Sequence, residues 1–119
     1  MKTSSAKAKG RLLQQLVAKK LRESFPQFTE LDIKSTSMGV TGEDVQLSQP
    51  AKNLLCIQIE CKNRAKIAVF QDYAQAKTHG NAEPVVVLKQ NRTKPLVLID
   101  LDYYMKLLKR SAVDAREEL

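Results

Sequence analysis

The chain has 119 residues, enough for one domain with a single hydrophobic core. Hydrophobic residues make up 43% and charged residues 28%, a composition that excludes an intrinsically disordered chain. No apolar run approaches the roughly 20 residues of a membrane-spanning helix, and the basic N-terminus lacks the apolar segment of a secretory signal. We therefore expect a cytoplasmic protein without a membrane partner.

The net charge of +7 is unevenly placed. The first acidic residue is Glu23, and seven basic residues precede it: Lys2, Lys7, Lys9, Arg11, Lys19, Lys20 and Arg22. A basic lobe of this kind attracts polyanions, with nucleic acid first and anionic membrane second. A solvated surface that aids solubility is the alternative, and the charge alone does not decide between them.

Hydrophobic periodicity divides the chain into predicted elements. Residues 1–8 are small, polar and basic, and they predict a flexible basic arm before a single domain over 9–119. Apolar residues recur at helical spacing over 9–25, where Pro26 ends the helix, and 27–42 reads as a loop. The later elements are a strand at 44–48, a turn at 49–53, a strand at 54–62, a helix at 67–78, strands at 84–89 and 96–100, and a last helix from about 102.

The resulting order, α-β-β-α-β-β-α, predicts a single α/β domain with a mixed central sheet flanked by helices. Cys56 and Cys61 both fall inside the strand predicted at 54–62, on opposite faces, so they should not form a disulfide. We expect two reduced and mostly buried thiols. With one His in the chain, a zinc site has too few ligands.

Two acids and a lysine form the most informative constellation. Glu60 and Lys62 share one face of their strand, because side chains repeat every two residues. A hairpin between the strands at 44–48 and 54–62 would bring Asp44 across from Glu60. Carboxylates hold Mg²⁺ or Mn²⁺, such an ion polarises a phosphate and activates water, and a lysine stabilises the developing negative charge. The alternative is a turn residue beside an exposed surface ion pair.

This arrangement, in which a helix precedes the strand with the Asp and a strand with Glu-x-Lys follows, resembles the PD-(D/E)xK nuclease superfamily. The nearest resemblance is to archaeal Holliday-junction resolvases and small phage-encoded endonucleases, over roughly residues 9–100. It is carried by KGR at 9–11, STSMGVTGEDVQLS at 35–48, ECKN at 60–63 and YAQA at 73–76. The resemblance implies a restriction-endonuclease-like core.

The resemblance also implies residue roles. Asp44 and Glu60 would be ligands of Mg²⁺ or Mn²⁺, Lys62 the catalytic lysine, and Gln75 a helical residue that supports the catalytic site. An ordinary solvent contact is the alternative for Gln75.

Two departures from the family pattern concern the same centre. The resolvases place a Glu on the first helix as a further metal ligand, where this chain has Gln14 and Gln15. An amide can hold a metal-bound water but adds no charge. Glu43 replaces the Pro of the superfamily's name.

Basic and hydroxyl side chains outside this centre are candidate phosphate contacts. Such side chains fix a protein on a nucleic-acid backbone without reading its sequence. No zinc finger or recognition helix is visible in the sequence. The candidates are Lys9, Arg11, Lys34, Ser35, Ser37, Arg64, Lys66, Arg92 and Lys94.

These features lead us to expect a Mg²⁺-dependent DNA endonuclease of a phage or a bacterial or archaeal cell. Its DNA substrate could be branched, and a homodimer would match the two-fold symmetry of a Holliday junction. Two alternatives stay open. One is a nuclease of the same fold that acts on flapped, linear or single-stranded nucleic acid, including RNA. The other is a non-catalytic nucleic-acid-binding accessory protein.

Overall fold

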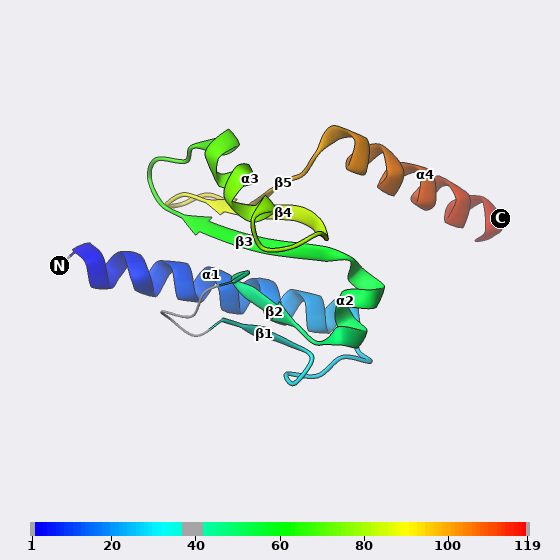
Figure 1. Cartoon of the computed structure of the whole chain (residues 1–119), viewed down its shortest axis with the longest axis horizontal. Coiled ribbons are helices and arrows are strands. Elements are labelled where there is room, and N and C mark those ends of the chain that lie inside the picture. The colour runs from blue at the N-terminus through cyan, green and yellow to red at the C-terminus, as the bar shows by residue number, and fades with distance from the viewer. Residues whose placement is uncertain (1, 37–41, 119) are drawn as a thin grey trace.

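A five-stranded mixed sheet organises the residues that the computed structural model describes, 2–36 and 42–118 (Figure 1). Its spatial order follows the chain, β1-β2-β3-β4-β5. β3 and β4 pair in parallel, and the other neighbours pair antiparallel. The predicted single α/β domain with a mixed sheet is confirmed. The strands are β1 (Ile33–Ser35), β2 (Val45–Leu47), β3 (Ile57–Asn63), β4 (Glu83–Lys89) and β5 (Leu96–Leu98).

Helices cover both faces of this sheet (Figure 1). α1 (Lys2–Ser24) packs on β1, β2 and β3, and α3 (Val69–Lys77) packs on β3 and β4. α2 (Gln49–Leu55) joins β2 to β3, and α4 (Leu101–Glu118) follows β5 and extends away from the sheet. Across the described residues, no helix combines the length and the apolar character that a membrane crossing requires.

Side-chain alternation along β3 decides what each face of the sheet carries. Ile59 and Cys61 are buried in the hydrophobic core beneath α1. Gln58, Glu60 and Lys62 have the other parity, and the amide of Gln58 hydrogen-bonds to the backbone of α3. The polar side chains of β3 therefore lie between the sheet and α3. The core on the α1 side contains Leu13, Ala18, Ile33, Val45, Leu47 and Ala51.

Two elements were not predicted, so the predicted order is wrong in detail. The observed order is α-β-β-α-β-α-β-β-α. β1 lies inside the stretch predicted as a loop, and Ile33 is its single apolar residue, so its sequence carries no strand signal. α2 occupies the predicted turn at 49–53. Its start signals were present, since the Ser48 hydroxyl accepts from the Ala51 N–H at 3.3 Å and Pro50 stands in the first turn.

Two local predictions need correction. α1 begins at Lys2 rather than at Lys9, so residues 2–8 continue the helix instead of forming a separate arm. Alanine and lysine both have high helix propensity, which explains the extension. Cys56 is not in a strand: it is the left-handed residue that ends α2, with φ of 55°, and it is exposed. Cys61 is buried in β3, and both thiols are free as predicted.

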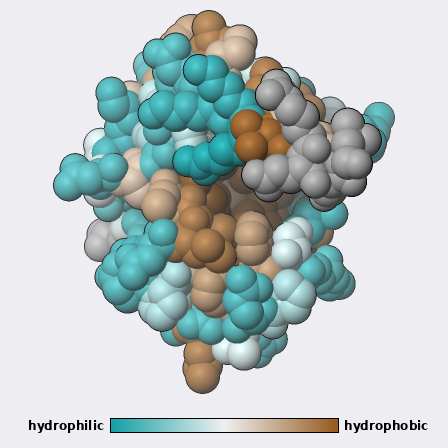
Figure 2. Space-filling view, turned by 90° about the vertical axis from the view of Figure 1, so that its right-hand side faces the viewer, coloured by the Kyte–Doolittle hydropathy of each residue, from teal (hydrophilic) through white to brown (hydrophobic). Residues whose placement is uncertain are grey.

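Apolar surface remains uncovered at the β5 side of the sheet. β5 is an edge strand, and Leu96 and Val97 are both more than 60% exposed. The space-filling view shows hydrophobic surface gathered near the middle of one end of the molecule, with hydrophilic residues around it (Figure 2). α4 also exposes apolar side chains at helical spacing, namely Leu101, Tyr104, Met105 and Leu108.

Candidate active site

β3 brings Glu60 and Lys62 together on the face covered by α3. Glu60 is only 3% exposed, and its Oε2 lies 3.0 Å from Nζ of Lys62. Lys62 is itself mostly buried, with 15% of its side chain exposed. The alternative of an exposed surface ion pair is therefore wrong. Burial of a carboxylate is unfavourable unless the carboxylate is paired, so Glu60 depends on Lys62 to be stable in this position.

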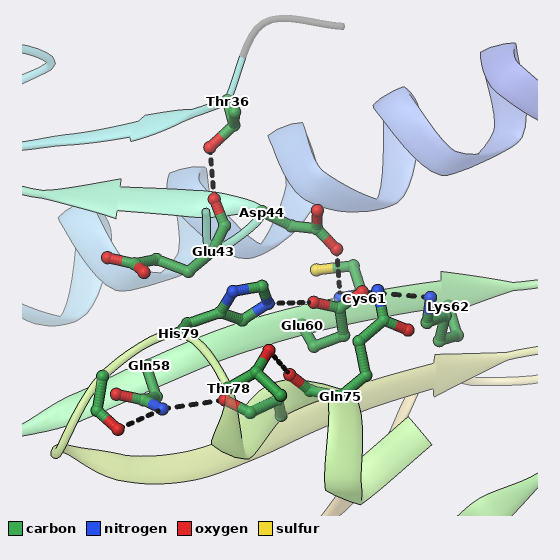
Figure 3. Close-up of polar contacts among 12 residues, drawn as sticks. Thr36, Glu43, Asp44, Gln58, Glu60, Cys61, Lys62, Gln75, Thr78 and His79 are labelled. Atoms are coloured by element: carbon green, nitrogen blue, oxygen red, sulfur yellow. Dashed lines mark hydrogen bonds and ion pairs between the residues drawn. The ribbon is translucent and has the colours of Figure 1, made fainter. Parts of the chain in front are cut away.

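Asp44 reaches the same strand from the start of β2. Val45 pairs with Ile59, and the Asp44 N–H donates to the Ile59 carbonyl at 2.9 Å. Two residues further along β3, the Cys61 N–H donates to Oδ2 of Asp44 at 2.7 Å (Figure 3). The carboxylate thus takes the place of a backbone partner for β3. This bond fixes Asp44 beside the strand that carries Glu60 and Lys62.

The pKa of Asp44 depends on its burial and on the charges around it. Burial raises this pKa above the ordinary value of 3.8, and the negative charge of Glu60 raises it further. The hydrogen bond from Cys61 and the positive charges of Lys62 and His79 act in the opposite direction, and the net effect is upward. Two carboxylates from adjacent strands therefore interact through their charges. Burial, followed by the negative charges of Asp44 and Glu60, raises the pKa of the Cys61 thiol, so that thiol stays protonated.

His79 is a site residue that the sequence analysis missed. Its Nε2 lies 2.7 Å from Oε1 of Glu60, so the carboxylate is bound on both sides, by Lys62 and by His79 (Figure 3). A lone His between the helix predicted at 67–78 and the strand predicted at 84–89 carries no local signal. The topology does carry a signal. Because β3 and β4 are parallel, the crossover between them must bring the end of α3, where His79 follows, back to the beginning of β3.

The three glutamines that the family pattern singles out have different environments. Gln75 is exposed and projects from α3 toward Glu60 and Lys62, so a contact with the site and a contact with solvent both stay open for it (Figure 3). Gln14 on α1 has a buried Oε1 without a hydrogen-bond partner within the described residues. Gln15 is exposed and lines a hollow beside Arg22 and Lys34.

The donor set suits a hard divalent cation. Within residues 2–36 and 42–118, no three side chains of His, Cys, Asp or Glu are grouped as a metal cluster. Mg²⁺ does not require such a cluster, since it binds one or two carboxylates and keeps several waters. Each carboxylate oxygen of Glu60 has a second lone pair, and Oδ2 of Asp44 is the oxygen committed to Cys61. A cation would also relieve the repulsion between Asp44 and Glu60.

Three basic side chains from distant parts of the chain line a hollow of about 300 Å³, together with two asparagines and the leucines Leu12, Leu13 and Leu16. Lys9 comes from α1, and its Nζ donates to Oδ1 of Asn91 at 2.9 Å. Lys89 and Arg92 contribute two further positive charges. Lys89 is paired with Asn63 where the parallel strands β3 and β4 end. Of these residues only Lys9 and Arg92 were predicted as phosphate contacts.

The other predicted contacts do not join this hollow. Lys34 and Ser35 lie on β1, an edge strand of the sheet that does not line the hollow. Arg64 forms an ion pair with the buried Asp72. Ser37 is outside the described residues. The remaining three are exposed, one on α1 and two in the loops before α3 and before β5: Arg11, Lys66 and Lys94.

No family model, curated protein or solved structure matches the chain. An assignment of function therefore depends on the side chains and their geometry. The most specific features are the buried Glu60–Lys62 pair and the Asp44 carboxylate anchored on β3.

The raised pKa of Asp44 predicts a pH-dependent stability difference between the wild type and Asp44→Asn in EDTA. Asparagine can still accept from the Cys61 N–H, but it carries no charge. Because the folded-state pKa is raised, the contribution of Asp44 is fully present below the unfolded pKa and is lost as the pH rises through the folded pKa. Relative to the variant, the wild type should lose free energy of unfolding as the pH rises from the unfolded-state pKa of Asp44 to its folded-state pKa. Urea denaturation at a series of pH values measures this difference.

The matched control is Asp114→Asn in the exposed part of α4, for which no pH-dependent difference is expected. A wild type that gains stability over Asp44→Asn as the pH rises would show that Asp44 is favourably ionised. That result would contradict its placement beside Glu60.

Proposed function

We propose that the protein is a Mg²⁺-dependent nuclease of the PD-(D/E)xK type that hydrolyses phosphodiester bonds in DNA. The observation that carries this proposal is the buried Glu60–Lys62 pair on β3 with Asp44 anchored to the same strand from β2. Strongly perturbed ionisable groups cluster at functional sites, and here a carboxylate with a raised pKa lies near a second carboxylate and a lysine.

The element order supports the finer assignment of a restriction-endonuclease-like core. α1 precedes the strand that begins beside Asp44, and the strand with Glu60 and Lys62 follows. α3 then covers that strand and directs Gln75 toward the pair (Figure 3). This is the arrangement on which the resemblance of the sequence to the superfamily depends.

Each side chain has a chemical role in this proposal. Mg²⁺ bound by Asp44 and Glu60 would polarise the phosphate and lower the pKa of an attacking water. The Lys62 ammonium is held in place by Glu60 at 3.0 Å and stabilises the negative charge that develops on the phosphate. Gln75 can donate an amide hydrogen bond at the same place. Burial on the α3 side strengthens these interactions, because water screens them less.

The basic hollow supports a polyanionic substrate. Lys9, Lys89 and Arg92 can contact phosphates, and such contacts position a nucleic acid without reading its bases. Selectivity would then come from the shape and deformability of the DNA, which favours a branched substrate. A homodimer would match the symmetry of such DNA, and the exposed apolar residues of β5 and α4 leave room for its interface.

One observation favours a second candidate, a non-catalytic nucleic-acid-binding protein. Both oxygens of Glu60 are already paired, one with Lys62 and one with His79. If the protein only binds nucleic acid, Glu60, Lys62 and His79 would serve only to stabilise the region between β3 and α3. Metal-dependent cleavage separates the two candidates.

Cleavage of a panel of four-way, flapped, duplex and single-stranded DNA and of RNA tests the proposal. We expect nicking in Mg²⁺ or Mn²⁺ and none in excess EDTA, with four-way junctions cut in preference. Lys62→Ala should reduce the rate by roughly 10²–10³, as the loss of a donor to a developing negative charge does in other enzymes. DNA affinity should stay near that of the wild type, because the basic hollow is intact.

Lys106→Ala is the matched control, since Lys106 is an exposed lysine on α4 and is not among the candidate phosphate contacts. It should retain the wild-type cleavage rate. Full activity in EDTA would contradict the metal mechanism. Binding of DNA without cleavage of any substrate would instead favour the non-catalytic candidate.

The salt dependence of DNA binding tests the hollow separately. In the double variant Lys9→Ala with Arg92→Ala, the slope of log K against log salt should become shallower by about 0.9 per lost phosphate contact on duplex DNA. Lys106→Ala with Lys109→Ala removes the same charge from α4, which lies at the other end of the molecule from the N-terminal part of α1 (Figure 1). Equal slopes for both double variants would show that only total charge matters.

A further inference from the structure

We propose that His79 is a positioning residue that fixes the Glu60 carboxylate for binding a divalent cation, an inference that rests on the proposed metal site. Nε2 of His79 lies 2.7 Å from Oε1 of Glu60, while Lys62 binds Oε2 at 3.0 Å. The carboxylate is thus held at both oxygens and cannot rotate freely.

The direction of the His79 hydrogen bond follows from chemistry. An ionised carboxylate only accepts hydrogen bonds, so the proton of this bond belongs to Nε2 of His79. The neutral imidazole is sufficient for that donation. Oε1 keeps a second lone pair, which can bind a cation while the histidine bond fixes its direction. Hydrogen bonds from outer groups orient metal-binding carboxylates and histidines in the same way in other metal sites.

The turn that carries His79 is held by a buried amide. Gln58 is 4% exposed, and its Nε2 donates to the carbonyls of Ala76 at 2.8 Å and Gly80 at 3.2 Å. Its Oε1 accepts from the Ala82 N–H at 3.0 Å. These three bonds bracket His79 on both sides in the chain. The turn is therefore anchored to β3 two residues before Glu60.

Glycine at position 80 is part of this arrangement. A Cβ atom there would lie 3.0 Å from Oε1 of Gln58, closer than ordinary van der Waals contact allows. The absence of a side chain lets the turn approach the amide. Gln58 and Gly80 thus fix the position of the turn relative to the sheet. His79 on that turn then orients the Glu60 carboxylate.

Direct Mn²⁺ binding, measured by calorimetry without DNA, tests this inference. His79→Ala should weaken Mn²⁺ binding by about 10–100-fold, the usual effect of losing an outer hydrogen bond to a ligand. His79→Gln should recover part of the affinity, because its amide can donate to the same oxygen. A purely structural role would lower thermal stability in EDTA and leave the Mn²⁺ affinity of the folded protein unchanged.

Two further variants separate the possible failures. Thr78→Ala is the control for the turn, since Thr78 bonds to the Gln75 carbonyl and not to Glu60, and it should bind Mn²⁺ as the wild type does. Glu60→Gln should abolish binding. If Glu60→Gln binds normally, or the wild type does not bind Mn²⁺, the metal site and this inference are both wrong. If Glu60→Gln abolishes binding while His79→Ala and His79→Gln match the wild type, only the inference about His79 is overturned.

Discussion

Burial of the Glu60 carboxylate is the constraint on which the rest of the site depends. A charged group that is 3% exposed must be paired, and the fold supplies Lys62 from the same strand and His79 from the turn after α3. Asp44 then adds a second carboxylate, anchored on the Cys61 N–H. Its raised pKa means that its ionised form destabilises the metal-free fold. Such a cost is typical of sites selected for function rather than for stability.

The part of this site that follows a strand period could be predicted from sequence. Glu60 and Lys62 share a face because side chains alternate, and antiparallel pairing brings Asp44 beside them. His79 could not be found in this way, because nineteen residues and a helix separate it from Glu60. Its position depends on the parallel pairing of β3 with β4 and on the bonds that Gln58 makes to the turn.

The fold and the distribution of charge could likewise be predicted where they depend on local sequence, and not where they depend on tertiary contacts. The predicted strands contain two or more apolar residues, whereas β1 contains only Ile33, so its presence depends on pairing with β2. The short α2 depends on the Ser48 cap. The basic N-terminal segment was visible in the sequence. Its grouping with Lys89 and Arg92 was not, because some eighty residues separate Lys9 from the turn after β4.

The central claim is that Asp44 and Glu60 together hold a divalent cation beside Lys62. Anomalous scattering from crystals soaked in Mn²⁺ tests it most directly, because the signal gives the position of the ion. The account predicts one peak within about 2–2.6 Å of a carboxylate oxygen of each residue. It also predicts that the peak disappears in Glu60→Gln. A peak elsewhere on the molecule, or Glu60 still paired with Lys62 and His79 and no peak at saturating Mn²⁺, would contradict it.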